Sequence, residues 1–323
     1  MLQVEAWAIF VVIVCLLLTL DLGFFNRNEH IISTKEALKT TCFWIFIALS
    51  FNVLVYFVYE NNWFELASHS NHLVNPGKNA ALEFFTGYII ELSLSFDNVF
   101  VIAMLFAYFK IPQQYQHRVL FWGILGALVS RGAMIIIGAA LVQKFDWIMY
   151  IFGALLIFSA LKMIFGKENE FDADKNKLVK LVRKVYPISK EFNGNKFFTR
   201  INGKRALTPL MVALIVIEAT DVMFAVDSIP AIFVITKDPF IVITSNVFAI
   251  LGLRSMYFVL VSMLNKFRYL QKSLIILLLF IGVKMLLMEV WHLPIQISLL
   301  IIVLILGGGV VVSIYKDRRK SFI

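Results

Sequence analysis

Two acidic side chains and an amide lie close together inside an apolar stretch of the chain. Residues 81–109 are largely apolar, yet the stretch contains Glu91, Asp97 and Asn98. An ionisable side chain at the centre of a membrane-spanning helix is unfavourable by about 2.5–3.5 kcal/mol on insertion scales, and such residues usually face a substrate pathway. The three side chains therefore indicate a functional site.

A second apolar stretch repeats this pattern. Asp221 precedes Asp227-Ser228 by the same six residues that separate Glu91 from Asp97-Asn98. Further along, the sequence around Arg131 and Lys162 in the first copy matches the sequence around Arg254 and Lys284 in the second. The chain therefore contains an internal repeat, at roughly 83–166 and 210–290.

Helical spacing predicts that part of each polar set shares one face. Glu91, Ser95 and Asn98 are four and three residues apart, so they lie on the same side of a regular helix. Asp221 and Ser228 occupy the equivalent face in the second copy.

The remaining acids fit this face less simply. Glu218 is three residues before Asp221 and joins its face, whereas Asp97 and Asp227 fall about 120° further round a straight helix. Either the helices bend at these points, which Pro230 favours in the second copy, or the acids line two adjoining walls of a site.

The chemistry of these groups favours a cation. Clustered carboxylate, amide and hydroxyl oxygens are ligands of hard or borderline divalent cations such as Mn²⁺, Mg²⁺ and Ca²⁺, whereas zinc and copper sites usually contain His or Cys. No His or Cys accompanies these acids. The same carboxylates offer exchange of protons for metal, because metal ligands bind in their deprotonated form.

The alternative is that the acids only stabilise helix packing, through buried ion pairs with Arg131 and Arg254. Two arginines, however, cannot neutralise the five acids at these positions. We therefore expect Arg131 and Arg254 to balance charge or to gate a site, with Ser95 and Ser228 as further polar groups beside it. Asp21, near the inner end of the first apolar stretch, is either an interfacial residue or part of a gate.

The composition excludes an ordinary soluble domain, because 60% of the residues are hydrophobic and only 16% are charged. Nine apolar stretches are long enough to cross a bilayer as helices: 4–25, 40–60, 81–109, 118–143, 146–166, 207–235, 240–263, 272–290 and 293–315. The expected fold class is an all-α polytopic membrane protein.

Lysines and arginines concentrate in the loops on one side of this predicted bundle. The positive-inside rule then predicts an external N-terminus and a cytoplasmic C-terminus. The net charge of +9 is explained by this topology, so we expect no nucleic-acid partner.

Each copy of the repeat has three predicted helices, so the second copy must enter the membrane from the opposite side. Inverted repeats of this kind recur in secondary transporters, which bind substrate between the two halves. We expect two accessory helices in 1–60, the repeats in 81–166 and 207–290, a basic cytoplasmic loop in 167–205, and a final helix with a basic tail in 293–323. Within the loop, Asn202-Gly203 predicts a short β-hairpin that must dock on another part of the protein.

The sequence around these residues resembles the TerC family of integral membrane proteins, closest to its Alx-type members. The motifs are FTGYIIELSLSFDNVFV at 85–101, EATDVMFAVDSIPA at 218–231 and DPFIVITSNVFAILGLR at 238–254. The resemblance implies a protein of the bacterial inner membrane, related to lysine-exporter-like transporters, that exports manganese and has a historical association with tellurite resistance. On the matching positions, it implies a metal role for Glu91, Asp97, Asn98, Glu218, Asp221 and Asp227.

The leading hypothesis is therefore a secondary transporter, not an enzyme, that needs no cofactor and exports Mn²⁺ through a carboxylate site between inverted repeats. Proton coupling is a further hypothesis, and a small cationic organic molecule is another candidate substrate. The alternative is a membrane scaffold of a metal or tellurite stress response, whose basic loop recruits partner proteins. A third hypothesis is an intramembrane aspartyl hydrolase. The sequence contains the two acids that such an enzyme needs, but it lacks the Gly-x-Gly-Asp motif expected around them. The sequence sets neither metal selectivity nor oligomeric state.

Overall fold

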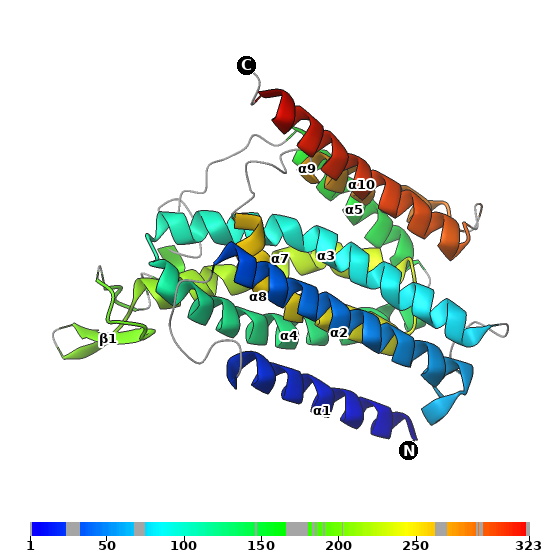
Figure 1. Ribbon diagram of the computed structural model, residues 1–323, viewed down its shortest axis with the longest axis horizontal. Coiled ribbons are helices and arrows are strands. Elements are labelled where there is room, and N and C mark those ends of the chain that lie inside the picture. The colour runs from blue at the N-terminus through cyan, green and yellow to red at the C-terminus, as the bar shows by residue number, and fades with distance from the viewer. Residues whose placement is uncertain are drawn as a thin grey trace.

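A computed structural model of the protein describes residues 2–23, 33–67, 75–145, 147–165, 180–182, 184, 186–189, 191–201, 203–261, 270–288, 290 and 293–320. This described part contains nine long helices and one small hairpin (Figure 1). Eight of these helices are long and apolar enough to cross a membrane, and the ninth, α9, is 17 residues long. The predicted all-α polytopic fold is confirmed.

Each long helix corresponds to one predicted apolar stretch. The helices are α1 (Leu2–Gly23), α2 (Thr34–Glu60), α3 (Pro76–Tyr108), α4 (Gln113–Lys144), α5 (Ile148–Phe165), α7 (Pro209–Phe233), α8 (Pro239–Val261), α9 (Leu270–Leu286) and α10 (Ile295–Lys320), with a short 3₁₀ helix η1 (Trp63–Glu65) after α2.

The largest difference from the prediction is at the start of α2, which begins at Thr34 and not at residue 40. Ser33 caps this helix, because its Oγ accepts a hydrogen bond from the amide of Glu36 at 3.3 Å. The first turn of α2 is polar, so a search for apolar residues alone misses it.

Four helices, α3, α4, α7 and α8, form the centre of the bundle. α3 packs on α8 and α4 packs on α7, while α3 also contacts α7 and α4 contacts α8. α8 is enclosed by protein along most of its length. The polar residues of the two repeat copies therefore face a common interior.

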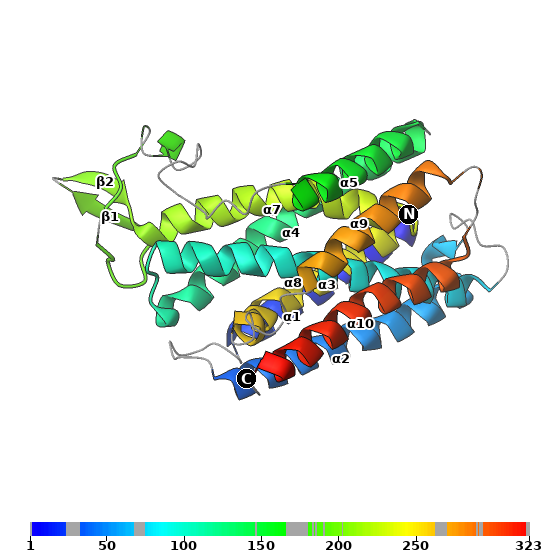
Figure 2. The same ribbon diagram turned by 90° about the horizontal axis from the view of Figure 1, so that it is seen from above.

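The other helices flank this centre. α2 covers α3 and α8, and α1 lies outside it (Figure 1). On the other flank α5 and α9 pack against each other, with α10 over α9 (Figure 2). Glycines allow the close approach of α5 and α9, because a Cβ on Gly282 would lie 3.0 Å from the carbonyl oxygen of Gly153.

The two ends of the chain lie at opposite ends of the bundle (Figure 1, Figure 2). α3 begins at the end that holds the N-terminus, whereas α7 begins at the end that holds the hairpin (Figure 1). The first helices of the two repeat copies thus run in opposite directions, as inverted repeats require. The boundaries of the repeats stay a prediction.

The predicted hairpin is present. Strand β1 (Phe198–Ile201) pairs antiparallel with β2 (Lys204–Leu207), and Gly203 adopts the left-handed φ of +77° that such a turn favours. The hairpin docks near the start of α4, where the guanidinium of Arg118 lies 5.3 Å from the centre of the Phe197 ring. Residues 167–179, 183, 185 and 190 of the predicted loop, and Asn202 of the turn, lie outside the described residues.

At the opposite end of the bundle, Asp238 caps α8. Its Oδ1 accepts a hydrogen bond from the amide of Phe240 at 2.9 Å, and its Oδ2 accepts one from the hydroxyl of Tyr59 at 2.6 Å. Burial raises the pKa of the Asp238 carboxyl, although these hydrogen bonds act in the opposite direction. This acid therefore joins α2 to the first turn of α8.

Candidate cation site

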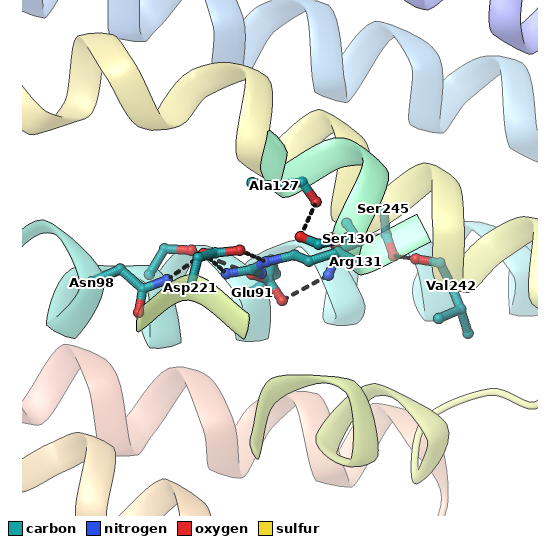
Figure 3. Close-up of polar contacts among 10 residues, drawn as sticks. Glu91, Asn98, Ala127, Ser130, Arg131, Asp221, Val242 and Ser245 are labelled. Carbon is teal, nitrogen blue, oxygen red and sulfur yellow. Dashed lines mark hydrogen bonds and ion pairs between the residues drawn. The ribbon is translucent and has the colours of Figure 1, made fainter. Parts of the chain in front are cut away.

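The polar residues of the two copies meet around Arg131 of α4 (Figure 3). Its Nε donates to Oδ2 of Asp221 at 2.9 Å, and its Nη2 donates to Oδ1 at 2.6 Å. Its Nη1 forms an ion pair with Oε1 of Glu91. Arg131 is 1% exposed, Asp221 is 8% exposed and Glu91 is 0% exposed. Arg131 therefore links an acid of α3 to its repeat counterpart on α7.

Two amide side chains complete this central cluster, which comprises Glu91, Asn98, Arg131, Asp221 and Asn246. Nδ2 of Asn98 donates to Oδ1 of Asp221 at 3.1 Å, and Nδ2 of Asn246 donates to Oε2 of Glu91 at 2.8 Å. The Oδ1 atoms of both asparagines are buried and accept no hydrogen bond from the described residues. Two amide oxygens are therefore available beside two carboxylates.

The predicted helical face is confirmed. Ser95 lies one turn from Glu91 and its Oγ donates to Oε1 of Glu91 at 3.4 Å, while Asn98, on the same face, reaches Asp221. The spacing of these residues on α3 therefore positions them on one wall of the central cluster.

The central cluster has more acid than base. With both carboxylates ionised, Glu91 and Asp221 carry two negative charges against the single positive charge of Arg131. An uncompensated charge is unfavourable in a buried environment. Within the central cluster, one negative charge is therefore left without a positive partner.

Glu218 lies beside the central cluster on the same helix as Asp221. Its half-buried carboxylate fills the space above Gly126 of α4, where a Cβ would collide with it. The absence of a side chain at Gly126 thus makes room for a third acid between α4 and α7.

Asp227 faces a different neighbour. Its Oδ1 accepts a hydrogen bond from the hydroxyl of Ser159 on α5 at 2.7 Å, and the positive charge of Lys162 acts on the same carboxylate. Asp221 and Asp227 therefore face different neighbours of α7, with Asp221 paired to α4 and Asp227 to α5. The hydroxyl of Ser228 is buried, with no hydrogen-bond partner in the described part of the chain.

The structure does not bring all six predicted metal ligands together. Glu91, Asn98 and Asp221 meet and Glu218 lies beside them, but Asp227 turns towards α5. The side chain of Asp97 lies outside the described residues. Among the described side chains, no three acids, histidines or cysteines converge on one point. Arg131 instead occupies the position between the two central acids.

A narrow cavity of about 30 Å³ reaches the central cluster, large enough for roughly one ordered water molecule. Its lining is mostly apolar, and its polar members are Asn98, Thr220, Asp221 and Arg254. The α3 part of the lining, Val101 to Leu105, follows Asn98 along the helix and so lies on the hairpin side of the cluster. The cavity therefore lies next to Asp221, mainly on the side of the cluster that faces the hairpin.

Arg254, the repeat counterpart of Arg131, does not bind the central acids. Its Nη2 forms an ion pair with Oδ1 of Asp21 on α1, and the two residues are 4% and 3% exposed. Asp21 is therefore buried against α8 as the charge partner of Arg254.

Sequence reasoning gave no role to Asn246 or Ser159. Asn246 follows Thr244 and Ser245 in α8 and lies eight residues before Arg254, hence about 80° from it around the helix. That spacing is a usable signal for a polar face. Ser159 has no comparable signal, because hydroxyl groups within apolar helices commonly bond to their own backbone.

The fold and the site define a polytopic membrane protein with a buried charged cluster among helices α3, α4, α7 and α8. Residues 77–321 match the family described as "Integral membrane protein TerC family". The chain belongs to this family, which confirms the resemblance seen in its motifs. The match begins at residue 77, so α1 and α2 lie before it.

Close relatives cover nearly the whole chain. An uncharacterized membrane protein of Myxococcus xanthus is 43% identical over 97% of this chain and 93% of its own length. A protein of Escherichia coli strain K12, named "Putative membrane-bound redox modulator Alx", is 42% identical over 98% of this chain and 96% of its own. An uncharacterized membrane protein of Rickettsia bellii is 39% identical over 97% and 98%. No solved structure matches the chain.

Proposed function

We propose that this protein is a secondary transporter that exports Mn²⁺, and that the central cluster binds the cation. The main support is that acids from two counterpart helices, Glu91 and Asp221, share one arginine in the middle of the bundle. Carboxylate and amide oxygens suit Mn²⁺ better than they suit zinc or copper. The site thus has the ligand chemistry and the position between two halves that such a transporter needs.

Cation binding requires Arg131 to withdraw from the acids. A guanidinium and a divalent cation compete for the same oxygens and repel each other. A cation that enters from the hairpin end meets Asp221 and Asn98 first, because these two residues line the cavity. Glu91 and Asn246 then supply oxygens from the other side of the cluster.

Release follows when one helical unit moves against the other and opens the opposite end. Arg131 then returns to the two acids and neutralises one of them, and a proton neutralises the remaining charge. Proton exchange is therefore part of the proposal, and Mn²⁺ flux that does not respond to an imposed pH gradient argues against this part alone.

The proposed setting is a bacterial inner membrane with the hairpin end in the cytoplasm. The support is the basic character of that end, which includes Arg200, Lys204 and Arg205 of the hairpin and the tail of α10.

A redox role, which the name of the Escherichia coli relative gives for that protein, has less support in this chain. Its two cysteines, Cys15 and Cys42, are free thiols on α1 and α2. Both precede the segment that the family match covers. The central cluster lies within that segment and is the better candidate for the centre of function.

Transport of Mn²⁺ into inside-out membrane vesicles tests the proposal. We expect the parent to take up Mn²⁺, Glu91→Gln and Asp221→Asn to lose most of this uptake, and Glu5→Gln to retain it. Glu5 is a matched control because it is an exposed carboxylate at the start of α1. Equal expression of all variants is checked by immunoblotting of the membranes.

A deletion separates the transporter from the scaffold. Removing residues 170–184 takes five basic residues out of the loop but leaves strands β1 and β2. A transporter keeps its Mn²⁺ uptake after this deletion. The scaffold is supported instead if Glu91→Gln and Asp221→Asn both retain Mn²⁺ uptake and only the deletion abolishes the metal or tellurite stress response of the cells.

A further inference from the structure

The two repeat-related arginines are in different environments. Arg131 lies between Glu91 and Asp221, which shows that an arginine at this point of the repeat can reach the acids of a neighbouring helix. Arg254 is bound instead by Asp21. This acid comes from α1, which precedes the family-matched segment.

Arg254 is nevertheless close to the central cluster. It lines the same narrow cavity as Asp221 and Asn98. Its Nη1 is buried and has no hydrogen-bond partner among the described residues. A guanidinium with an unused donor thus lies on the wall of the cavity beside Asp221.

The contacts of α1 explain how Asp21 is held in place. Near its N-terminal end, α1 docks through aromatic rings, with Trp7 at 5.2 Å and Phe10 at 6.0 Å from Phe240 between ring centres. Most of the remaining surface of α1 is not buried by the protein. At the other end of α1, the ion pair of Asp21 with Arg254 is its buried polar attachment to α8.

We propose that Asp21 is a positioning residue for cation entry, which it controls by holding Arg254 against α1. In this position the Arg254 charge is neutralised, and the guanidinium does not pair with Asp221 across the cavity. Without Asp21, Arg254 repels the incoming cation and competes for Asp221. This inference rests on the proposed Mn²⁺ transport.

The proposal predicts opposite effects for the two partners of one ion pair. Asp21→Asn leaves the positive charge of Arg254 unopposed, so the half-saturating Mn²⁺ concentration should rise by roughly tenfold. This is the lower end of the effect that a nearby positive charge has on proton binding to a carboxylate. Arg254→Gln removes that charge, so the half-saturating concentration falls below that of the parent. A purely structural ion pair predicts instead that both variants lose stability and neither changes the half-saturating concentration.

The test measures Mn²⁺ uptake by inside-out vesicles over a range of Mn²⁺ concentrations, with expression and monodispersity checked for each full-length variant. Asp21→Glu keeps the charge and is expected to restore the parent value, and Glu5→Gln controls for loss of a carboxylate elsewhere on α1. If Asp21→Asn does not fold, the double variant Asp21→Asn/Arg254→Gln replaces the ion pair with two neutral groups. Its half-saturating concentration is expected to be no higher than that of the parent.

Two results overturn the inference in distinguishable ways. In the first, the parent transports Mn²⁺ but the folded variants at Asp21 and Arg254 have the same half-saturating Mn²⁺ concentration as the parent. This result refutes the role of Asp21 and leaves the transport proposal intact. A parent that transports no Mn²⁺ refutes the transport proposal and this inference with it.

Discussion

Replacing Arg131 with glutamine tests how the central cluster is neutralised. In the parent, one buried guanidinium makes two hydrogen bonds to Asp221 and an ion pair with Glu91. Arg131→Gln leaves two buried carboxylates side by side with no positive partner. We therefore expect a large loss of stability in metal-free buffer.

The size of this loss follows from the burial of the group. Removing one partner of a buried ion pair typically destabilises a protein by about 3–5 kcal/mol, because it leaves an uncompensated charge. At roughly 2–4 °C per kcal/mol, the unfolding temperature of Arg131→Gln should fall by on the order of 10 °C. The side chain of Arg131 is only 1% exposed, so water does not replace its contacts.

Mn²⁺ should reverse part of this loss. A cation at a concentration about 100 times its dissociation constant stabilises the folded state by about 2.7 kcal/mol. In Arg131→Gln the acids are free to bind the cation, whereas in the parent the cation must first displace the guanidinium. Added Mn²⁺ should therefore raise the unfolding temperature of the variant more than that of the parent.

Thermal unfolding of the purified protein in detergent, with and without Mn²⁺, measures both effects. A control adds Glu91→Gln and Asp221→Asn to Arg131→Gln, which removes every charge from the cluster and should recover stability while abolishing the response to Mn²⁺. An unfolding temperature for Arg131→Gln equal to that of the parent, or an equal response to Mn²⁺ in both proteins, refutes this reasoning.

Two further predictions concern the surroundings of the cluster. Gly126→Val places a side chain where the Glu218 carboxylate lies, so Mn²⁺ uptake should fall severalfold. Gly307→Val is the control and should leave uptake unchanged, because a Cβ at Gly307 meets nothing within 4 Å. At the opposite end of the bundle, burial raises the pKa of Asp238 above 3.8. Ionisation of this carboxyl therefore opposes folding. The parent loses stability as the pH rises from 3.8 to the pKa of the folded state. Asp238→Asn lacks this penalty. The unfolding temperature of the parent, measured relative to that of the variant, should therefore fall as the pH rises above 3.8, and a difference that stays constant with pH contradicts the assignment.

Much of the fold could be predicted because it depends on local patterns. Apolar stretches long enough to span a bilayer gave the number and order of the helices, and Asn202-Gly203 gave the hairpin. The six-residue spacing of the acids identified the repeat. The polar cap of α2 at Ser33 was missed because it adds a turn with no apolar signal.

The site was predictable only in part, because spacing along one helix defines a face but not the neighbour of that face. The shared face of Glu91 and Asn98 was therefore correct, whereas the pairing of Glu91 with Asn246 depends on how α3 meets α8. For the same reason the sequence could not tell that Asp227 faces Ser159 of α5. The partner of Arg254 comes from α1, more than two hundred residues away in the chain.

The most direct test of the account is Mn²⁺ transport by the purified protein reconstituted alone into liposomes, with a Mn²⁺-quenched fluorophore inside. We predict uptake by the parent and by Glu5→Gln, and no uptake above that of empty liposomes by Asp221→Asn of equal monodispersity. Undiminished uptake by Asp221→Asn, or no uptake by the parent, would contradict the claim that the central cluster carries Mn²⁺ across the membrane.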